Sequence, residues 1–171
     1  MDTMKTRIIL TILLSSILTI TYSQNEIKQR TEFNMKLPVD REKYYEQKVE
    51  SSVYFVKDKV LQIYPGEKLL IEVEIDKNEI TFMKVVKKNL NPEKTIEIEF
   101  SQKVKERKNE MMMLKISNPL NIDIEYKAMM FIVGHDKWLN TNVLPVRAKL
   151  TSYETWPDVI ITLVLTEWKL K

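Results

Sequence analysis

Cysteine is absent from this chain of 171 residues, and the chain has only two glycines and one histidine. Without cysteine it can form no disulfide and can carry no lipid on a cysteine thiol. A zinc site would lack its usual nitrogen and sulfur ligands, so we expect no metal and no cofactor. Stability must come from apolar burial, and a domain of about 150 residues buries roughly 70% of its unfolded surface.

An excess of charge of one sign is also missing. The chain has 27 Lys and Arg against 24 Asp and Glu, which gives a net charge of +3. This balance argues against a nucleic-acid partner. The densest charged block, residues 103–110, mixes both signs. It could be a basic patch for an acidic glycan or a phospholipid head group, but the interrupting acidic residues favour a solvated hairpin tip.

No apolar run is long enough to cross a bilayer as a helix, which takes about 17 to 25 residues. The run at residues 8–20 is shorter, follows Lys5 and Arg7, and ends in small or polar residues up to Ser23. That order is typical of a secretory signal peptide covering residues 1–23. We expect cleavage before Gln24 and a periplasmic or secreted product with no membrane span. A retained anchor is the alternative.

What the chain does have is period-two alternation. Leu69, Ile71 and Val73 alternate with polar or exposed positions, and Ile96 and Ile98 repeat the pattern. This pattern predicts half-buried β-strands. Turn residues such as Pro and Asn separate the runs. The predicted strands cover residues 52–56, 60–64, 68–75, 80–87, 94–102, 111–117, 123–133, 143–152 and 159–169.

These strands predict an all-β fold, an immunoglobulin-like two-sheet antiparallel sandwich of about 7–9 strands. The sandwich domain is expected at residues 51–171, and residues 24–50 are expected to form an extended N-terminal arm or edge segment. Within that segment, residues 41–49 offer a short helical turn. A domain boundary at residues 88–94 is the alternative. With so few glycines, primed two-residue hairpin turns should be scarce.

No catalytic motif stands out. Serine-nucleophile and glycine-rich phosphate signatures are absent from the sequence. His135 is predicted to lie in a loop beside Gly134 and Asp136, without metal or catalytic partners. The consecutive Met111, Met112 and Met113 could suggest a copper(I) site. Neighbouring strand residues point to opposite faces, so core packing with Met112 or Met113 inward is the better interpretation.

Three aromatic residues near the C-terminus are the candidate ligand-binding positions. Trp138 is expected in a loop, and Trp156 precedes Pro157 in the turn before the final strand, with Tyr153 close by. Exposed aromatic rings stack on the faces of sugars, which would make a glycan site. The other interpretation is that these rings close the open end of the sandwich.

The last third of the chain resembles a family of exported proteins. The segments carrying the resemblance are LKISNPL (114–120), YKA (126–128), TNVLPV (141–146) and YETWP (153–157). They look like those of uncharacterised exported immunoglobulin-like sandwich proteins of Bacteroidota. The resemblance implies a sandwich fold and an exported location, and it brings no catalytic residues.

The sequence therefore predicts a non-catalytic binding or structural module of the cell envelope. Its partner is expected to be another envelope or extracellular protein, engaged through a sheet edge or the loop end. A glycan-binding module that uses Trp138, Tyr153 and Trp156 is the second hypothesis. A hydrolase with an unrecognised carboxylate pair is the third, since carboxylate separation is a spatial matter.

Overall fold

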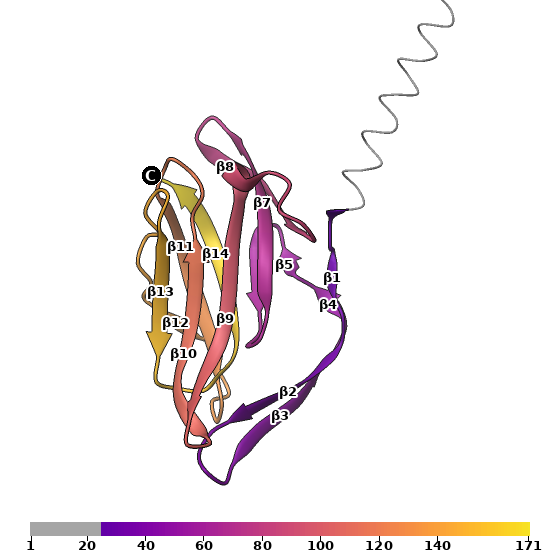
Figure 1. Cartoon of the computed structure of the whole chain (residues 1–171), viewed down its shortest axis with the longest axis vertical. Coiled ribbons are helices and arrows are strands. Elements are labelled where there is room, and N and C mark those ends of the chain that lie inside the picture. The colour runs from indigo at the N-terminus through magenta and orange to yellow at the C-terminus, as the bar shows by residue number, and fades with distance from the viewer. Residues whose placement is uncertain (1–24) are drawn as a thin grey trace, which may run out of the picture.

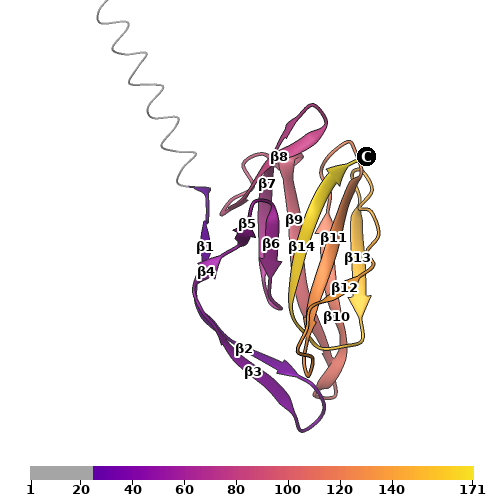
Figure 2. The same cartoon turned by 180° about the vertical axis from the view of Figure 1, so that it is seen from behind.

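Alternating apolar residues build two antiparallel five-stranded sheets that pack face to face (Figures 1 and 2). The computed structural model describes residues 25–171, so the predicted signal peptide lies outside the described residues. The all-β sandwich is confirmed. In spatial order one sheet contains β13 (Thr151–Trp156), β10 (Lys108–Ser117), β9 (Thr95–Lys105), β7 (Lys68–Asp76) and β8 (Glu79–Val86); the other contains β12 (Leu139–Thr141), β11 (Ile124–Ile132), β14 (Ile160–Leu170), β6 (Val60–Ile63) and β5 (Phe55–Lys57).

The core lies between the inner faces of the two sheets. In β9, Ile96, Ile98 and Phe100 are fully buried, whereas the alternating Glu97 and Glu99 stay partly exposed. Each such apolar side chain contributes about 1.5 to 3 kcal/mol when it leaves water. The methionine run follows the same rule. Met112 is fully buried and its two neighbours are only half-buried, as the alternation predicts.

The N-terminal segment forms a hairpin of β2 (Phe33–Pro38) and β3 (Tyr44–Val49), flanked by the short pair β1 (Gln29–Arg30) and β4 (Ser52–Val53). The predicted helical turn at residues 41–49 is wrong, because β2 offers a strand partner over six residue pairs. The hairpin also buries its own apolar face. Its buried and half-buried side chains pack against the sandwich in a second cluster that includes Met35, Leu37, Val49, Val159 and Ile161.

The predicted strand at residues 143–152 is also wrong, since most of this stretch is irregular and the strands lie on either side of it, at β12 and β13. Pro145 interrupts the stretch and has no amide hydrogen to donate to a ladder. Val146 forms an isolated backbone bridge with Ile124, and side chains bond to other backbone groups of the stretch. The Asp123 carboxylate accepts a hydrogen bond from the Ala148 amide at 2.8 Å, and Asn118 donates its side-chain amide to the Val146 carbonyl at 3.0 Å.

Primed turns occur despite the shortage of glycine, so that expectation is wrong too. Lys77 and Asn78 connect β7 to β8 with φ values of 48° and 65°, and Glu106 and Arg107 connect β9 to β10 with 50° and 66°. The right-handed twist of the paired strands selects this turn geometry even where no glycine is available. Residues 103–110 include the second turn, so the charged block does form a hairpin tip.

Among residues 25–171, the one named helical element is a short 3₁₀ turn, η1 (Pro92–Lys94), which leads into β9. In the part of the chain that the structure describes, no helix has the length and apolar character needed to cross a membrane.

Candidate functional site

β13 is the outermost strand of its sheet and pairs on one side only, with β10 (Figure 1). The pairing runs from Met112 opposite Trp156 to Ser117 opposite Thr151 without a register shift. Within residues 25–171 no strand covers its other side. An edge of this kind presents a row of backbone donors and acceptors to an incoming chain.

The register determines which residues present those groups. The Asn118 amide donates to the Leu150 carbonyl at 2.9 Å, so even-numbered residues of β13 bond to β10. Backbone groups alternate in direction along an antiparallel strand. The N–H and C=O groups of Thr151, Tyr153 and Thr155 therefore point away from the sheet, and no backbone hydrogen bond to them occurs within the described residues.

The other edge strands of the two five-stranded sheets are shorter or covered. Residues 25–27 lie along β8, where the Ile27 amide donates to the Val85 carbonyl at 2.8 Å, and the Lys59 ammonium donates to the Ile80 carbonyl at 2.9 Å. In the second sheet, β5 and β12 each contain three residues, and the pairing of β5 is interrupted by a register shift. Short, bulged or covered edges resist pairing with another chain.

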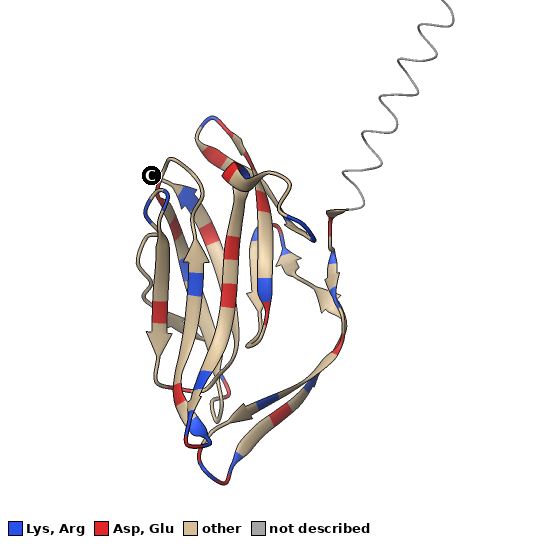
Figure 3. Ribbon diagram, viewed as in Figure 1, with Lys and Arg blue, Asp and Glu red and all other residues tan. Residues whose placement is uncertain are grey.

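β13 carries few of the usual protections of an edge, the inward-facing Glu154 being one of them. It contains no Lys, Arg or Pro, and its single charged residue is Glu154 (Figure 3). The Glu154 carboxylate already has a hydrogen-bond partner, because it accepts from the Leu144 amide at 2.7 Å. Leu144, Leu150 and Tyr153 are all exposed. The edge is thus uncharged on its open side and bordered by apolar side chains.

The structure separates the three predicted aromatic residues. Tyr153 is 57% exposed, whereas Trp156 is 9% exposed and donates its indole N–H to the Thr141 hydroxyl at 2.9 Å. An odd spacing on a regular strand places these two side chains on opposite faces. Trp138 is 41% exposed and its ring lies 5.4 Å from that of Phe131. Trp156 therefore joins the two sheets, and Trp138 and Tyr153 remain as exposed rings.

Behind the edge lies a buried pair from the opposite sheet. The Tyr126 and Trp168 rings stack with centroids 5.3 Å apart. Burial, and secondarily the nearby Glu154 carboxylate, raises the pKa of the Tyr126 hydroxyl well above its ordinary value of 10.0. A hydroxyl held neutral in this way is a poor nucleophile and a poor base. This pair therefore contributes packing to the edge and no reactive group.

His135 lies exposed in the loop after β11, where its backbone amide donates to the Ile132 carbonyl at 3.1 Å. Among residues 25–171, no group of three or more His, Cys, Asp or Glu side chains is arranged to hold a metal ion.

Sequence reasoning selected Tyr153 and Trp156 for their rings and missed Thr151 and Thr155, whose backbones complete the edge. The alternation of Thr151, Tyr153 and Thr155 in a stretch of high β-propensity is a signal that could have located this strand.

No protein-family model, curated protein or solved structure matches this chain.

Proposed function

We propose that this protein is an exported, non-catalytic module that binds another envelope protein by adding an extended segment of that partner to the open edge of β13. The observation that carries the proposal is the outward row of backbone groups at Thr151, Tyr153 and Thr155. Main-chain hydrogen bonds supply affinity in this mode of recognition, and neighbouring side chains supply specificity.

The chemistry of the edge favours a polypeptide. Donors and acceptors that alternate along a strand match those of another strand. The exposed Leu144, Leu150 and Tyr153 offer apolar contacts beside that row. Export rests on the signal-like sequence of residues 1–23, and the resemblance to exported immunoglobulin-like sandwiches favours the same location.

A photo-reactive phenylalanine analogue incorporated at Tyr153 tests the proposal in the intact envelope of the producing cells. The matched control carries the analogue at Phe82, an exposed aromatic position on β8, at the opposite edge of the same sheet. We expect a protein partner to cross-link at position 153 and not at position 82.

Thr155→Pro then removes one outward N–H without touching the bonds to β10, so the cross-link at position 153 should be lost. Circular dichroism checks that this variant remains folded. Equal capture at both positions, or a cross-link that survives Thr155→Pro, would contradict the proposal. Recovery of no protein at position 153 would count equally against it.

A glycan-binding function is the second candidate, because Trp138 and Tyr153 both expose their rings. Replacement of Trp138 by Ala should then abolish binding to a glycan array while Trp156 remains buried. An array without any signal for the unchanged protein would exclude this candidate.

A further inference from the structure

A second open edge belongs to β2, at the N-terminal hairpin. The Val39 amide donates to the Lys43 carbonyl at 2.9 Å, and the same register pairs Leu37 with Tyr45. Odd-numbered residues of β2 therefore bond to β3, and even-numbered residues point the other way. The backbone groups of Asn34 and Lys36 have no backbone partner in the described chain.

The end of β9 presents a matching edge. β9 extends beyond the end of β7. Its last backbone hydrogen bonds on the β7 side join Phe100 to Gly66 and Glu67, at 2.8 and 3.0 Å. Backbone groups at even positions point toward the β7 side. Gln102 and Val104 thus leave their N–H and C=O groups free on that side among residues 25–171.

These two edges border one cavity. A cavity of about 410 Å³ is lined by β2 and by Ser101, Gln102 and Val104, with the Pro65–Gly66 turn also contributing. A second cavity of about 290 Å³ shares Phe33 and this turn, and continues toward Arg30. Figure 1 shows β2 running toward the β9–β10 turn, where the Gln102 side chain donates to the Pro38 carbonyl at 2.8 Å. We call this space the β2–β9 slot.

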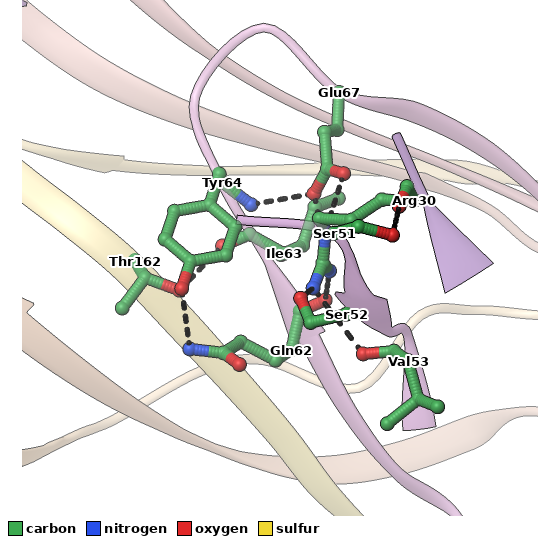
Figure 4. A network of polar contacts seen from close by, with 9 residues as sticks. All are labelled: Arg30, Ser51, Ser52, Val53, Gln62, Ile63, Tyr64, Glu67 and Thr162. Atoms are coloured by element: carbon green, nitrogen blue, oxygen red, sulfur yellow. Dashed lines mark hydrogen bonds and ion pairs between the residues drawn. The ribbon is translucent and has the colours of Figure 1, made fainter. Parts of the chain in front are cut away.

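The wall of the slot on the β1 side is held by a buried polar network (Figure 4). Arg30 is only 2% exposed, and its guanidinium donates to the Glu67 carboxylate, the Ser52 hydroxyl and backbone carbonyls. The Glu67 carboxylate also accepts the Tyr64 amide at 2.8 Å. These bonds tie β1 to the start of β7. The guanidinium already has its partners, so it fixes the wall and is not available to a ligand.

The lining of the larger cavity is almost uncharged. Lys36 is its one charged residue, and the Lys36 ammonium pairs with the Glu46 carboxylate at 2.6 Å. Phe33, Pro65 and Val104 add apolar surface. Unpaired backbone groups on two sides and a nearly uncharged lining are the features expected of a site that binds an extended strand.

We propose that the β2–β9 slot binds an extended, uncharged segment of another polypeptide, with apolar side chains at alternate positions. The segment bonds to Asn34 and Lys36 on one side and to Gln102 and Val104 on the other. The site is distinct from the β13 edge and does not depend on it. All six residues of β2 line the slot, so a bound segment that runs alongside β2 would need about six residues.

A displayed library of random heptapeptides, selected on the immobilised protein, supplies the probe. The strongest binder is synthesised and its affinity measured by titration calorimetry. Asn34→Pro removes a slot-facing N–H that β3 does not use, so it should weaken binding at least tenfold. Lys48→Pro is the matched control, because Lys48 lies opposite Asn34 with its N–H on the outer edge of β3 and does not line the cavity. It should change the affinity less than twofold.

Amide hydrogen exchange locates the bound peptide. The amides of Asn34, Lys36, Gln102 and Val104 should exchange rapidly in the free protein and slowly in the complex. If Asn34→Pro unfolds the hairpin, Val104→Pro removes a donor from the opposite wall and should give the same loss of affinity.

Unchanged binding to a folded Asn34→Pro or Val104→Pro variant would overturn the proposal, as would a library without any binder. Protection confined to residues 151–156 would also overturn it, while leaving the function proposed for β13 intact. A protein dimer that forms without peptide and dissociates in Asn34→Pro would assign the slot to a second copy of the chain, against the proposal.

Discussion

Arg30 and Glu67 form a buried ion pair that joins the N-terminal segment to the sandwich, with 2.9 Å between the Arg30 Nε and the Glu67 Oε1. The guanidinium also lies over the rings of Tyr54 and Tyr64, 4.7 and 5.0 Å from their centroids. Forming such a pair carries a large desolvation cost. Removal of one partner therefore destabilises the protein mainly because it leaves the other charge buried and unpaired.

Replacement of Arg30 by Ala should lower the free energy of unfolding by about 3 to 5 kcal/mol, because the Glu67 carboxylate would stay buried without its partner. Chemical denaturation followed by circular dichroism measures the loss. Arg41→Ala is the control, since the pair of Arg41 with Glu106 is exposed and should contribute little. Equal effects of the two variants would contradict the structural role of Arg30.

Replacement of Tyr126 by Phe should stabilise the protein. The Tyr126 hydroxyl is buried and has no hydrogen-bond partner within the described chain, so its removal ends a desolvation cost of about 1 kcal/mol or more. Trp156→Phe is the contrasting variant and should destabilise, because its indole N–H has a partner in Thr141. Thermal unfolding measures both variants, and a lower melting temperature for Tyr126→Phe would contradict the expectation.

Residues that favour left-handed backbone conformations should stabilise the β7–β8 turn. Lys77 and Asn78 both adopt left-handed backbone conformations, which Asn and Gly adopt at lower cost than Lys. The double substitution Lys77→Asn and Asn78→Gly should raise the free energy of unfolding by about 1 kcal/mol. Denaturant titration checks this gain, with each single variant as a control. No gain in the double variant would show that the turn is not under strain.

Stability should fall in acid through Glu72. Burial raises the pKa of its carboxyl, but hydrogen bonds from Lys84 and Asn91 outweigh burial and hold the pKa below its ordinary value of 4.5. A lowered folded-state pKa means that the ionised group stabilises the fold above about pH 4.5, and that this contribution is lost as the pH falls through the folded value.

Glu72→Gln should therefore lose stability at neutral pH and approach the unchanged protein in acid. Denaturation at a series of pH values gives the difference between the two proteins. A difference that stays constant from neutral to acid pH would show that ionisation of Glu72 makes no contribution.

Local pattern was a good guide wherever a strand has one buried face. Strand β9 illustrates this, since Ile96, Ile98 and Phe100 alternate with Glu97 and Glu99 and the predicted position agrees with the observed one. The pattern misled where side chains replace strand pairing. Val146 and its neighbours look like a strand in sequence, yet Val146 forms only an isolated bridge with Ile124, and Asn118 and Asp123 side chains bond to further backbone groups of the stretch.

The hairpin at residues 33–49 is a second place where the local sequence pattern predicts the wrong secondary structure. Tyr44, Tyr45 and Val49 fit a helical spacing locally, and a helix would satisfy the backbone without any partner. Pairing with the neighbouring strand β2 and burial against Val159 and Ile161 decide the outcome, and the last two residues lie more than 100 positions away along the chain.

The sequence by itself determined the all-β class, the alternation that places the core, and the lack of cysteine, because these depend on residue type and on periods of two. The tertiary structure alone decided which edges stay open. Strand order and register leave β13 and β2 open, and the path of residues 25–27 covers β8; all of these arise from contacts between different segments of the chain.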